Sequence, residues 1–251
     1  MRKANIAVTA AAAFGLALAA GCGQEDITLP DAGEGGQIGG CGAWYPGGGE
    51  ADAGVSYGAD LGDTFNCFVW QSVRSGEQQS NADPATYANA YLSMGEIYLK
   101  STEPDMSALL EAQFGVPEAK AIIFAVAAEN CGACPTLMGG VTASKDELLE
   151  DGIIPIGVTG LDLQSSAVNL NLVQGDKIMI QDGFDEALYR TNDPDHLLGD
   201  WFSFDAFPYL IGVRVSDMKV MIRSTPDLYF NESQTAIDVA KLAQALGVSE
   251  E

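Results

Sequence analysis

Residues 119–135 have the sequence AKAIIFAVAAENCGACP, and this stretch decides how the rest of the chain is interpreted. Its first part, Ala121–Ala127, is an unbroken apolar run, which predicts a strand buried on both faces, as in a parallel sheet. Cys131 and Cys134 follow at once, and we expect a helix to begin there. Backbone N–H groups and the positive end of a helix dipole favour a thiolate at such a place. Thiols in that setting have pKa values of roughly 3.5–7.5, against about 8.5 for a free cysteine, which suits disulfide exchange.

The charge of the chain excludes two classes of partner. Its 251 residues include 35 acidic and 12 basic side chains, for a formal net charge of −23. Nucleic acids and anionic lipid surfaces are both bound through clustered Lys and Arg, so the composition argues against either. The acidity predicts a solvated, self-repelling surface or, alternatively, a basic partner. The apolar content of 47% is ample for a core, and the length fits either one large domain or one domain with an extension.

The N-terminal residues have the features of an export signal. A positively charged start is followed by an apolar segment over residues 6–20 and by small residues just before Cys22. Residues 1–21 thereby resemble a bacterial lipoprotein signal peptide, which implies that Cys22 becomes diacylated and begins the mature protein. The sequence departs from that pattern at Ala19, where Leu is usual. An ordinary secretory signal, cut near Ala20 or Gly21, is the alternative.

Lipidation of Cys22 predicts a protein of the bacterial cell envelope, anchored on the extracytoplasmic side of the inner or the outer membrane. No later segment of the sequence is long and apolar enough to span a bilayer. Export also implies an oxidising compartment, in which disulfides persist. Residues 22–56 are rich in Gly and acidic, without Lys or Arg, and predict a flexible tether. The folded domain is expected over residues 57–251.

The chain has five cysteines, and their spacing predicts two disulfides. With Cys22 lipidated, four remain, and more than one connectivity is open to them. Cys131 and Cys134 are neighbours in the sequence, which leaves Cys41 and Cys67 as the second predicted pair. That bridge would fasten the end of the tether to the folded domain. The alternative is that both of these cysteines are unpaired and buried.

Hydrophobic periodicity predicts the other elements of the domain. Strands are expected over residues 65–70, 95–99, 153–159, 207–213 and 218–223, the last two as a hairpin. Helices are expected over 105–114, after the cysteine pair with a kink or break at Gly139-Gly140, and over 233–246. Residues 164–174 are weakly helical in pattern, and 175–203 are expected to be mostly irregular. Residues 57–118 thus form an extension before the core, 119–251.

This order of elements resembles the thioredoxin fold. The resemblance rests on Ala128–Cys134, with the sequence A-E-N-C-G-A-C against A-E-W-C-G-P-C in thioredoxin, and on Phe207-Pro208. Over residues 60–247 the chain is similar to the redoxin group, the extracytoplasmic, membrane-tethered thioredoxin-like proteins. The resemblance implies an α/β fold with a central mixed sheet flanked by helices and an N-terminal β-hairpin extension.

The resemblance also implies a role for each matching residue. Cys131 corresponds to the attacking cysteine and Cys134 to the resolving one, which agrees with an exposed first sulfur and a second one turn inward. Pro208 corresponds to the cis-proline that faces the disulfide and keeps metal from the thiols; an ordinary trans proline at a strand start is the alternative. The substrate groove is implied to be lined by Asn130, Gly132, Ala133 and Phe207. No cofactor and no metal are expected.

Three departures from thioredoxin change the expected chemistry. Asn130 replaces Trp, so the rim of the site is more polar, and Ala133 replaces Pro, which is expected to alter the reduction potential. No acid stands in the strand where thioredoxin buries an Asp. Glu129 is the nearest carboxylate, and it is either a proton acceptor or a solvated charge on the rim.

The sequence therefore predicts a membrane-tethered thiol–disulfide oxidoreductase that acts on disulfide-containing envelope proteins, with its membrane electron donor or acceptor left open. A peroxidase would need Pro and Thr or Ser ahead of the cysteine, and residues 124–128 have none of these. A copper-handling lipoprotein would need a distant histidine, and the single one, His196, lies in an acidic stretch and is expected to be surface. A protein that keeps its disulfide only for structure is the last alternative.

Overall fold

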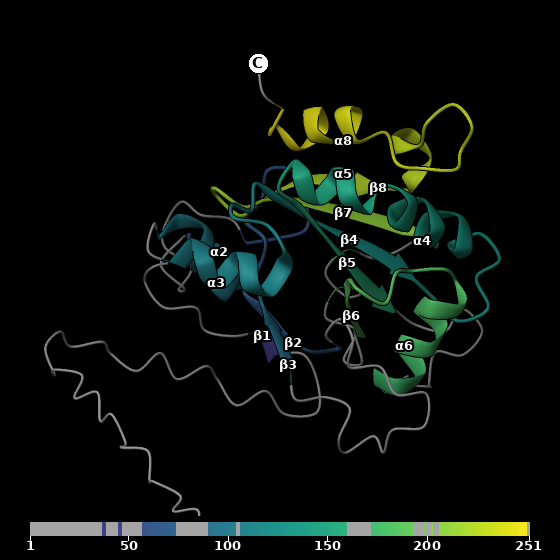
Figure 1. Ribbon diagram of the computed structural model, residues 1–251, viewed down its shortest axis with the longest axis horizontal. Coiled ribbons are helices and arrows are strands. Elements are labelled where there is room, and N and C mark those ends of the chain that lie inside the picture. The colour runs from purple at the N-terminus through teal and green to yellow at the C-terminus, as the bar shows by residue number, and fades with distance from the viewer. Residues whose placement is uncertain are drawn as a thin grey trace, which may run out of the picture.

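The computed structural model describes residues 37–38, 45–46, 57–73, 90–103, 106–159, 172–192, 198, 202 and 206–249. Within these residues, one mixed 8-stranded sheet forms the centre of the molecule (Figure 1). Its order is β1-β2-β6-β5-β4-β7-β8, and β3 pairs with β2 off this path. The strands are β1 Gln37–Ile38, β2 Phe68–Val73, β3 Ala90–Ser93, β4 Ala121–Ala127, β5 Ile153–Thr159, β6 Tyr189–Asn192, β7 Tyr209–Arg214 and β8 Lys219–Ser224.

Strand β4 lies in the middle of the sheet, as its apolar run predicted. It pairs in parallel with β5 and antiparallel with β7, and all of its residues are buried. Because side chains alternate along a strand, Ile122, Phe124 and Val126 enter one apolar cluster and Ile123 and Ala125 the other. The sheet is thus covered on both faces, and the expected mixed sheet flanked by helices is confirmed.

Helices cover the two faces (Figure 1). Residues of α4 and α8 belong to one apolar cluster, and residues of α2 and α3 belong to the other. The helices are α2 Met94–Thr102, α3 Ser107–Phe114, α4 Cys134–Ala143, α5 Lys145–Glu150, α6 Leu172–Gln181 and α8 Val239–Leu246, with the 3₁₀ turn η2 at Pro226–Tyr229. The helix predicted over 105–114 and the strands predicted over 153–159, 207–213 and 218–223 are therefore confirmed to within two residues at the ends that the structure describes.

The strand predicted over 95–99 is wrong, because these residues lie in helix α2. Ser93 caps this helix, and its side chain accepts a hydrogen bond of 3.3 Å from the backbone N–H of Glu96. Glu96 also pairs with Lys100 one turn later. Ser-x-x-Glu is the capping-box pattern, and it outweighs the strand preference of the Ile-Tyr-Leu run. The N-terminal β-hairpin exists, but it is formed by β2 and β3.

The irregular region predicted over 175–203 is also wrong in part, because it contains most of α6 and all of β6. Gly175 lets α6 approach β5 closely: a Cβ there would lie 3.1 Å from Oγ1 of Thr159, which donates a hydrogen bond of 2.9 Å to the Gly175 carbonyl. Strand β6 has the polar sequence YRTN and yet is buried between β5 and β2. Its polar composition does not indicate a buried strand, so the sequence did not predict β6.

Two further predictions about helices need correction. The helix is not broken at Gly139-Gly140, because α4 runs through both residues and ends at Ala143. Ser144 separates α4 from α5, and its hydroxyl donates to the carbonyl of Ile237 (3.1 Å) and accepts from its N–H (2.9 Å). The last helix begins at Val239 rather than at residue 233, because Asp238 caps it by accepting from the N–H of Lys241 at 3.0 Å.

The folded domain includes parts of the segment 22–56 that the sequence assigned to a flexible tether. β1 pairs with β2, and the side chain of Tyr45 is only 2% exposed. The Tyr45 hydroxyl donates a hydrogen bond of 2.9 Å to the carbonyl of Phe65. Burial of a large aromatic ring with its hydroxyl satisfied stabilises this attachment. The contacts of the domain therefore begin before residue 57.

Candidate functional site

The two cysteines of the CxxC motif lie between the end of β4 and the start of α4. The sulfurs of Cys131 and Cys134 are joined by a disulfide of 2.07 Å, and their Cα atoms are 5.4 Å apart. The N–H of Cys131 donates to the carbonyl of Ala128 at 3.3 Å, and the N–H of Cys134 donates to the carbonyl of Cys131 at 3.2 Å. Two successive turns thus carry the chain from the strand into the helix, with Cys131 shared between them.

The two sulfurs differ in their access to solvent. Cys131 retains 9% of its surface exposed, whereas Cys134 is fully buried. Both belong to the apolar cluster that includes Leu137 and Met138 of α4. The residues around Cys131 are exposed; they are Asn130, Gly132, Ala133, Pro135 and Thr136. A partner molecule can therefore approach the first cysteine and not the second.

The start of α4 provides the electrostatic setting for a thiolate at Cys131. Ala133 caps the helix without a side-chain hydrogen bond, and the first turn has no acidic residue. The positive end of the helix dipole at this position stabilises a negative charge on sulfur. Glu129 is half-buried beside this turn.

The Phe207–Pro208 peptide lies at the same end of the sheet as the disulfide. It is cis, as the resemblance to thioredoxin implied. Tyr209 follows it and pairs with Val126, near the end of β4 that leads to the cysteines. Phe207 is half-buried and packs against the apolar cluster that contains Cys131 and Cys134. The residues predicted to form the site are thus placed at one end of the sheet.

Other predicted residues lie partly or wholly outside the described part of the chain. Cys67 is buried and disulfide-bonded, but its predicted partner Cys41 lies outside the described residues, so that pairing stays a prediction. Cys22, with the predicted signal peptide, and His196 lie outside them as well. The described residues contain no cluster of three or more metal-ligating side chains, and none of their helices is long and apolar enough to cross a membrane.

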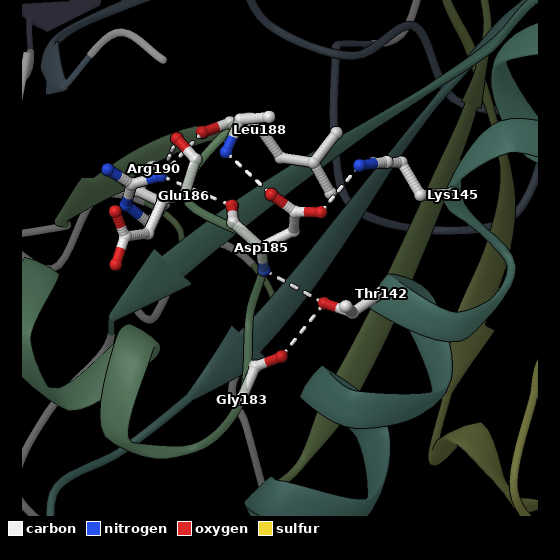
Figure 2. A network of polar contacts seen from close by, with 8 residues as sticks. Thr142, Lys145, Gly183, Asp185, Glu186, Leu188 and Arg190 are labelled. Atoms are coloured by element: carbon white, nitrogen blue, oxygen red, sulfur yellow. Dashed lines mark hydrogen bonds and ion pairs between the residues drawn. The ribbon is translucent and has the colours of Figure 1, made fainter. Parts of the chain in front are cut away.

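Sequence reasoning missed a polar network behind the CxxC helix (Figure 2). The Thr142 hydroxyl, near the end of α4, donates to the carbonyl of Gly183 and accepts from the N–H of Asp185, both at 2.8 Å. Lys145 of α5 forms an ion pair with Asp185 at 2.6 Å. The hydrogen bond from Lys145 lowers the pKa of the Asp185 carboxyl and raises that of the Lys145 ammonium. The connection between α6 and β6 is thus fastened to the far end of the CxxC helix.

Arg190 holds the same connection from within the sheet (Figure 2). Its guanidinium is fully buried, and it donates through one nitrogen to the carbonyls of Asp185 (3.2 Å), Glu186 (2.7 Å) and Leu188 (2.9 Å). Its Nε pairs with the buried carboxylate of Asp176 on α6. The sequence signal for this network was an arginine within the short polar run of β6. That signal does not indicate which residues the arginine contacts.

One cavity among the described residues is remote from the cysteines. It has a volume of about 570 Å³ and lies between α3, α5, β5 and the start of β6. Ile154 and Pro155, near the first residue of β5, form part of its wall, whereas the CxxC motif follows the last residue of β4. Because β4 and β5 are parallel, the cavity and the disulfide lie toward opposite ends of the sheet. The cavity is not part of this site.

Comparisons with known proteins found similarity only among solved structures. No family model and no curated protein matches the sequence. A candidate thiol:disulfide interchange protein DsbE from Chlorobium tepidum is 12% identical, with a TM-score of 0.46 over 75% of this chain and 99% of that one. A hypothetical protein from Sinorhizobium meliloti is 11% identical (TM-score 0.47; 78% and 91% covered). A thioredoxin-like protein from Aeropyrum pernix is 10% identical (TM-score 0.41; 72% and 89% covered).

The topology agrees with the sequence resemblance. A buried strand, the CxxC motif, a helix, a parallel strand, and then an antiparallel hairpin and a last helix follow one another along the chain. The fold is thioredoxin-like. The CxxC disulfide occupies the turn between β4 and α4 of this thioredoxin-like domain, which points to redox chemistry of sulfur.

Proposed function

We propose that this protein is a thiol–disulfide oxidoreductase that exchanges disulfides with envelope proteins through Cys131 and Cys134. The observation that carries the proposal is the difference between the two sulfurs. Cys131 is partly accessible at the start of α4, and Cys134 is buried within bonding distance of it. This is the arrangement that a two-step exchange needs, because one sulfur must meet the substrate and the other must displace it.

Starting from the reduced pair, the Cys131 thiolate attacks one sulfur of a substrate disulfide. The substrate S–S bond breaks, a mixed disulfide forms, and the other substrate sulfur leaves as a thiolate that takes up a proton. The Cys134 thiolate then attacks the Cys131 sulfur and releases the second substrate thiol. Two electrons pass from the protein to the substrate, and the Cys131–Cys134 disulfide is formed. The reverse sequence oxidises a substrate dithiol, so the same site serves either direction.

The tether and the compartment belong to the same proposal. The sequence of residues 1–22 supports export and lipidation at Cys22, which would hold the domain at a membrane of the cell envelope. Its substrates would then be disulfide-containing proteins of that compartment. A dithiol or disulfide partner in the membrane would restore the Cys131–Cys134 pair after each cycle.

The proposal is tested by disulfide reduction with the full chain, using insulin as substrate and dithiothreitol as the electron source. Cys131→Ser is expected to abolish the reduction that the unchanged chain catalyses. Ala143→Ser, an exposed change at the other end of α4, is the matched control and should retain full activity. Turnover that survives Cys131→Ser, or its absence in the unchanged chain, would rule out this function and leave the disulfide with a structural role.

The reduction potential of the pair measures the direction of the reaction. A value near about −270 mV would indicate a reductant like thioredoxin, and one near about −120 mV an oxidant. The potential is obtained by equilibrating the full chain with glutathione redox buffers and trapping free thiols.

A further inference from the structure

The backbone just before Cys131 has an unusual conformation. Asn130 has φ = 60°, in the left-handed region, and within the described residues only Met218 and Gln234 share a positive φ among non-glycine residues. Asn130 is the third residue of the turn closed by the hydrogen bond from the Cys131 N–H to the Ala128 carbonyl. Glu129, the second residue, has no positive φ. A positive φ at the third position alone is the pattern of a type II turn, which favours Gly or Asn there.

The exposed side chain of Asn130 does not pack into the core, so packing is not the reason for this residue type. The left-handed conformation is costly for most L-residues because Cβ approaches the following carbonyl oxygen, and Asn is one of the few that adopt it routinely. An asparagine here therefore serves the backbone of the turn.

The turn decides where Cys131 lies relative to α4. Cys131 donates its N–H to the first turn and offers its carbonyl to the N–H of Cys134 in the second, so both turns meet at this residue. A change of φ at position 130 alters the direction of the chain at Cys131. It thereby changes the place of the Cys131 sulfur at the helix start.

We propose that Asn130 is a positioning residue for Cys131: its left-handed backbone sets the turn that places the attacking sulfur at the N-terminal end of α4. The attacking role of Cys131 in this proposal rests on the exchange function proposed above. The test below measures only the reactivity of the Cys131 thiol and does not depend on that function. Asn130 does not take part in the bond exchange itself, and its side-chain amide is not required.

The test is the alkylation of Cys131 by iodoacetamide in the dithiothreitol-reduced full chain, followed by peptide mass analysis between pH 4 and pH 9. Asn130→Val, a β-branched change, is expected to slow alkylation at pH 7 by about tenfold. It should also move the midpoint of the pH profile upward, because a displaced sulfur loses the stabilisation of its thiolate by the helix end. Asn130→Gly, which adopts a positive φ freely, should stay within about twofold of the unchanged chain.

Gln234 offers a matched control because it has φ = 55° on an exposed turn of another segment. Gln234→Val should lower the stability of the fold as Asn130→Val does, while the Cys131 pH profile stays unchanged. If Asn130→Val fails to fold, Asn130→Ala replaces it, with a smaller shift in the same direction expected.

Three outcomes would overturn the proposal. One is a rate and midpoint in Asn130→Val or Asn130→Ala equal to those of the unchanged chain. Another is an Asn130→Gly variant as slow as Asn130→Val, which would assign the role to the amide. The third is an equal shift in Gln234→Val. Loss of insulin reduction in the unchanged chain, with these alkylation differences intact, would overturn the exchange function and support the positioning role.

Discussion

Gly140 of the CxxC helix lies directly against the ring of Phe230. A Cβ at position 140 would be 2.5 Å from Cε1 of Phe230, closer than any side chain tolerates. Phe230 is 9% exposed and belongs to the same apolar cluster as the two cysteines. The absence of a side chain at Gly140 therefore lets the connection between β8 and α8 pack on the helix that begins at Cys134.

Gly140→Ala is expected to destabilise the fold by about 1–3 kcal/mol, because the Phe230 ring must move out of a packed site. The neighbouring Gly139 is the matched control, since a Cβ there would meet nothing within 4 Å. Gly139→Ala should stabilise the helix by about 0.5–1 kcal/mol. Urea unfolding of the two variants measures both effects, and equal changes of the same sign would contradict the packing argument.

Asp176→Asn should be the most damaging single change among the polar contacts. It leaves the fully buried guanidinium of Arg190 without its carboxylate, and breaking a buried pair in this way costs about 3–5 kcal/mol. Lys145→Met removes the half-exposed partner of Asp185 and should cost no more than about 1 kcal/mol. Chemical denaturation of both variants measures this contrast. Similar losses in the two would mean that burial does not control the strength of these pairs.

Stability near Asp185 should fall as the pH falls. The Lys145 hydrogen bond lowers the pKa of the Asp185 carboxyl below 3.8 in the folded state. A lowered carboxyl pKa contributes stability that is present above the unfolded pKa and is lost as pH falls through the folded pKa. The unchanged chain should thus exceed Asp185→Asn in unfolding free energy at pH 7, and the difference should shrink below about pH 4.

Asp182 should behave in the opposite way, although it is only three residues distant. Burial raises the pKa of its carboxyl above 3.8, so its ionised form destabilises the folded state. Asp182→Asn is expected to stabilise the protein at pH 7, and the gain should vanish as the pH falls below about 4. Denaturant midpoints between pH 3 and pH 7 check both variants. A pH trend of the same sign in the two would contradict the assigned causes.

Cys134→Ser should trap the protein on its substrate. Without the second sulfur, the mixed disulfide between Cys131 and a substrate cannot be resolved from within and should accumulate. Non-reducing electrophoresis of the variant mixed with a disulfide-bonded substrate would show the adduct, and dithiothreitol would release it. Cys131→Ser is the control and should form no adduct. An adduct of equal yield in the control would contradict the assignment of the attacking role to Cys131.

The central strand and the CxxC turn could be predicted because their signals are local. An unbroken apolar run favours a buried strand wherever it occurs, and the paired cysteines need only one helical turn to meet. Phe207-Pro208 could be predicted only through the resemblance to thioredoxin, since nothing in a Phe-Pro dipeptide alone specifies its place beside the cysteines.

The errors have physical causes that differ from one element to another. In α2 a local signal was present, the Ser93 and Glu96 capping box, but the prediction gave more weight to a short run of strand-forming residues. In β6 there was no local signal, because the strand is polar and is held by its neighbours β5 and β2. In α4 the two glycines, Gly139 and Gly140, weaken the helix locally but do not break it, and Phe230, far along the chain, packs against Gly140.

By itself, the sequence determined the buried strand β4, the pair of cysteines that follows it and the acidic character of the chain, since periodicity, spacing and composition are local properties. Only the tertiary structure decided which strands flank β4 and how the α6–β6 connection is tied to the CxxC helix. The physical reason is that pairing and burial depend on segments distant along the chain, whose approach no local pattern encodes.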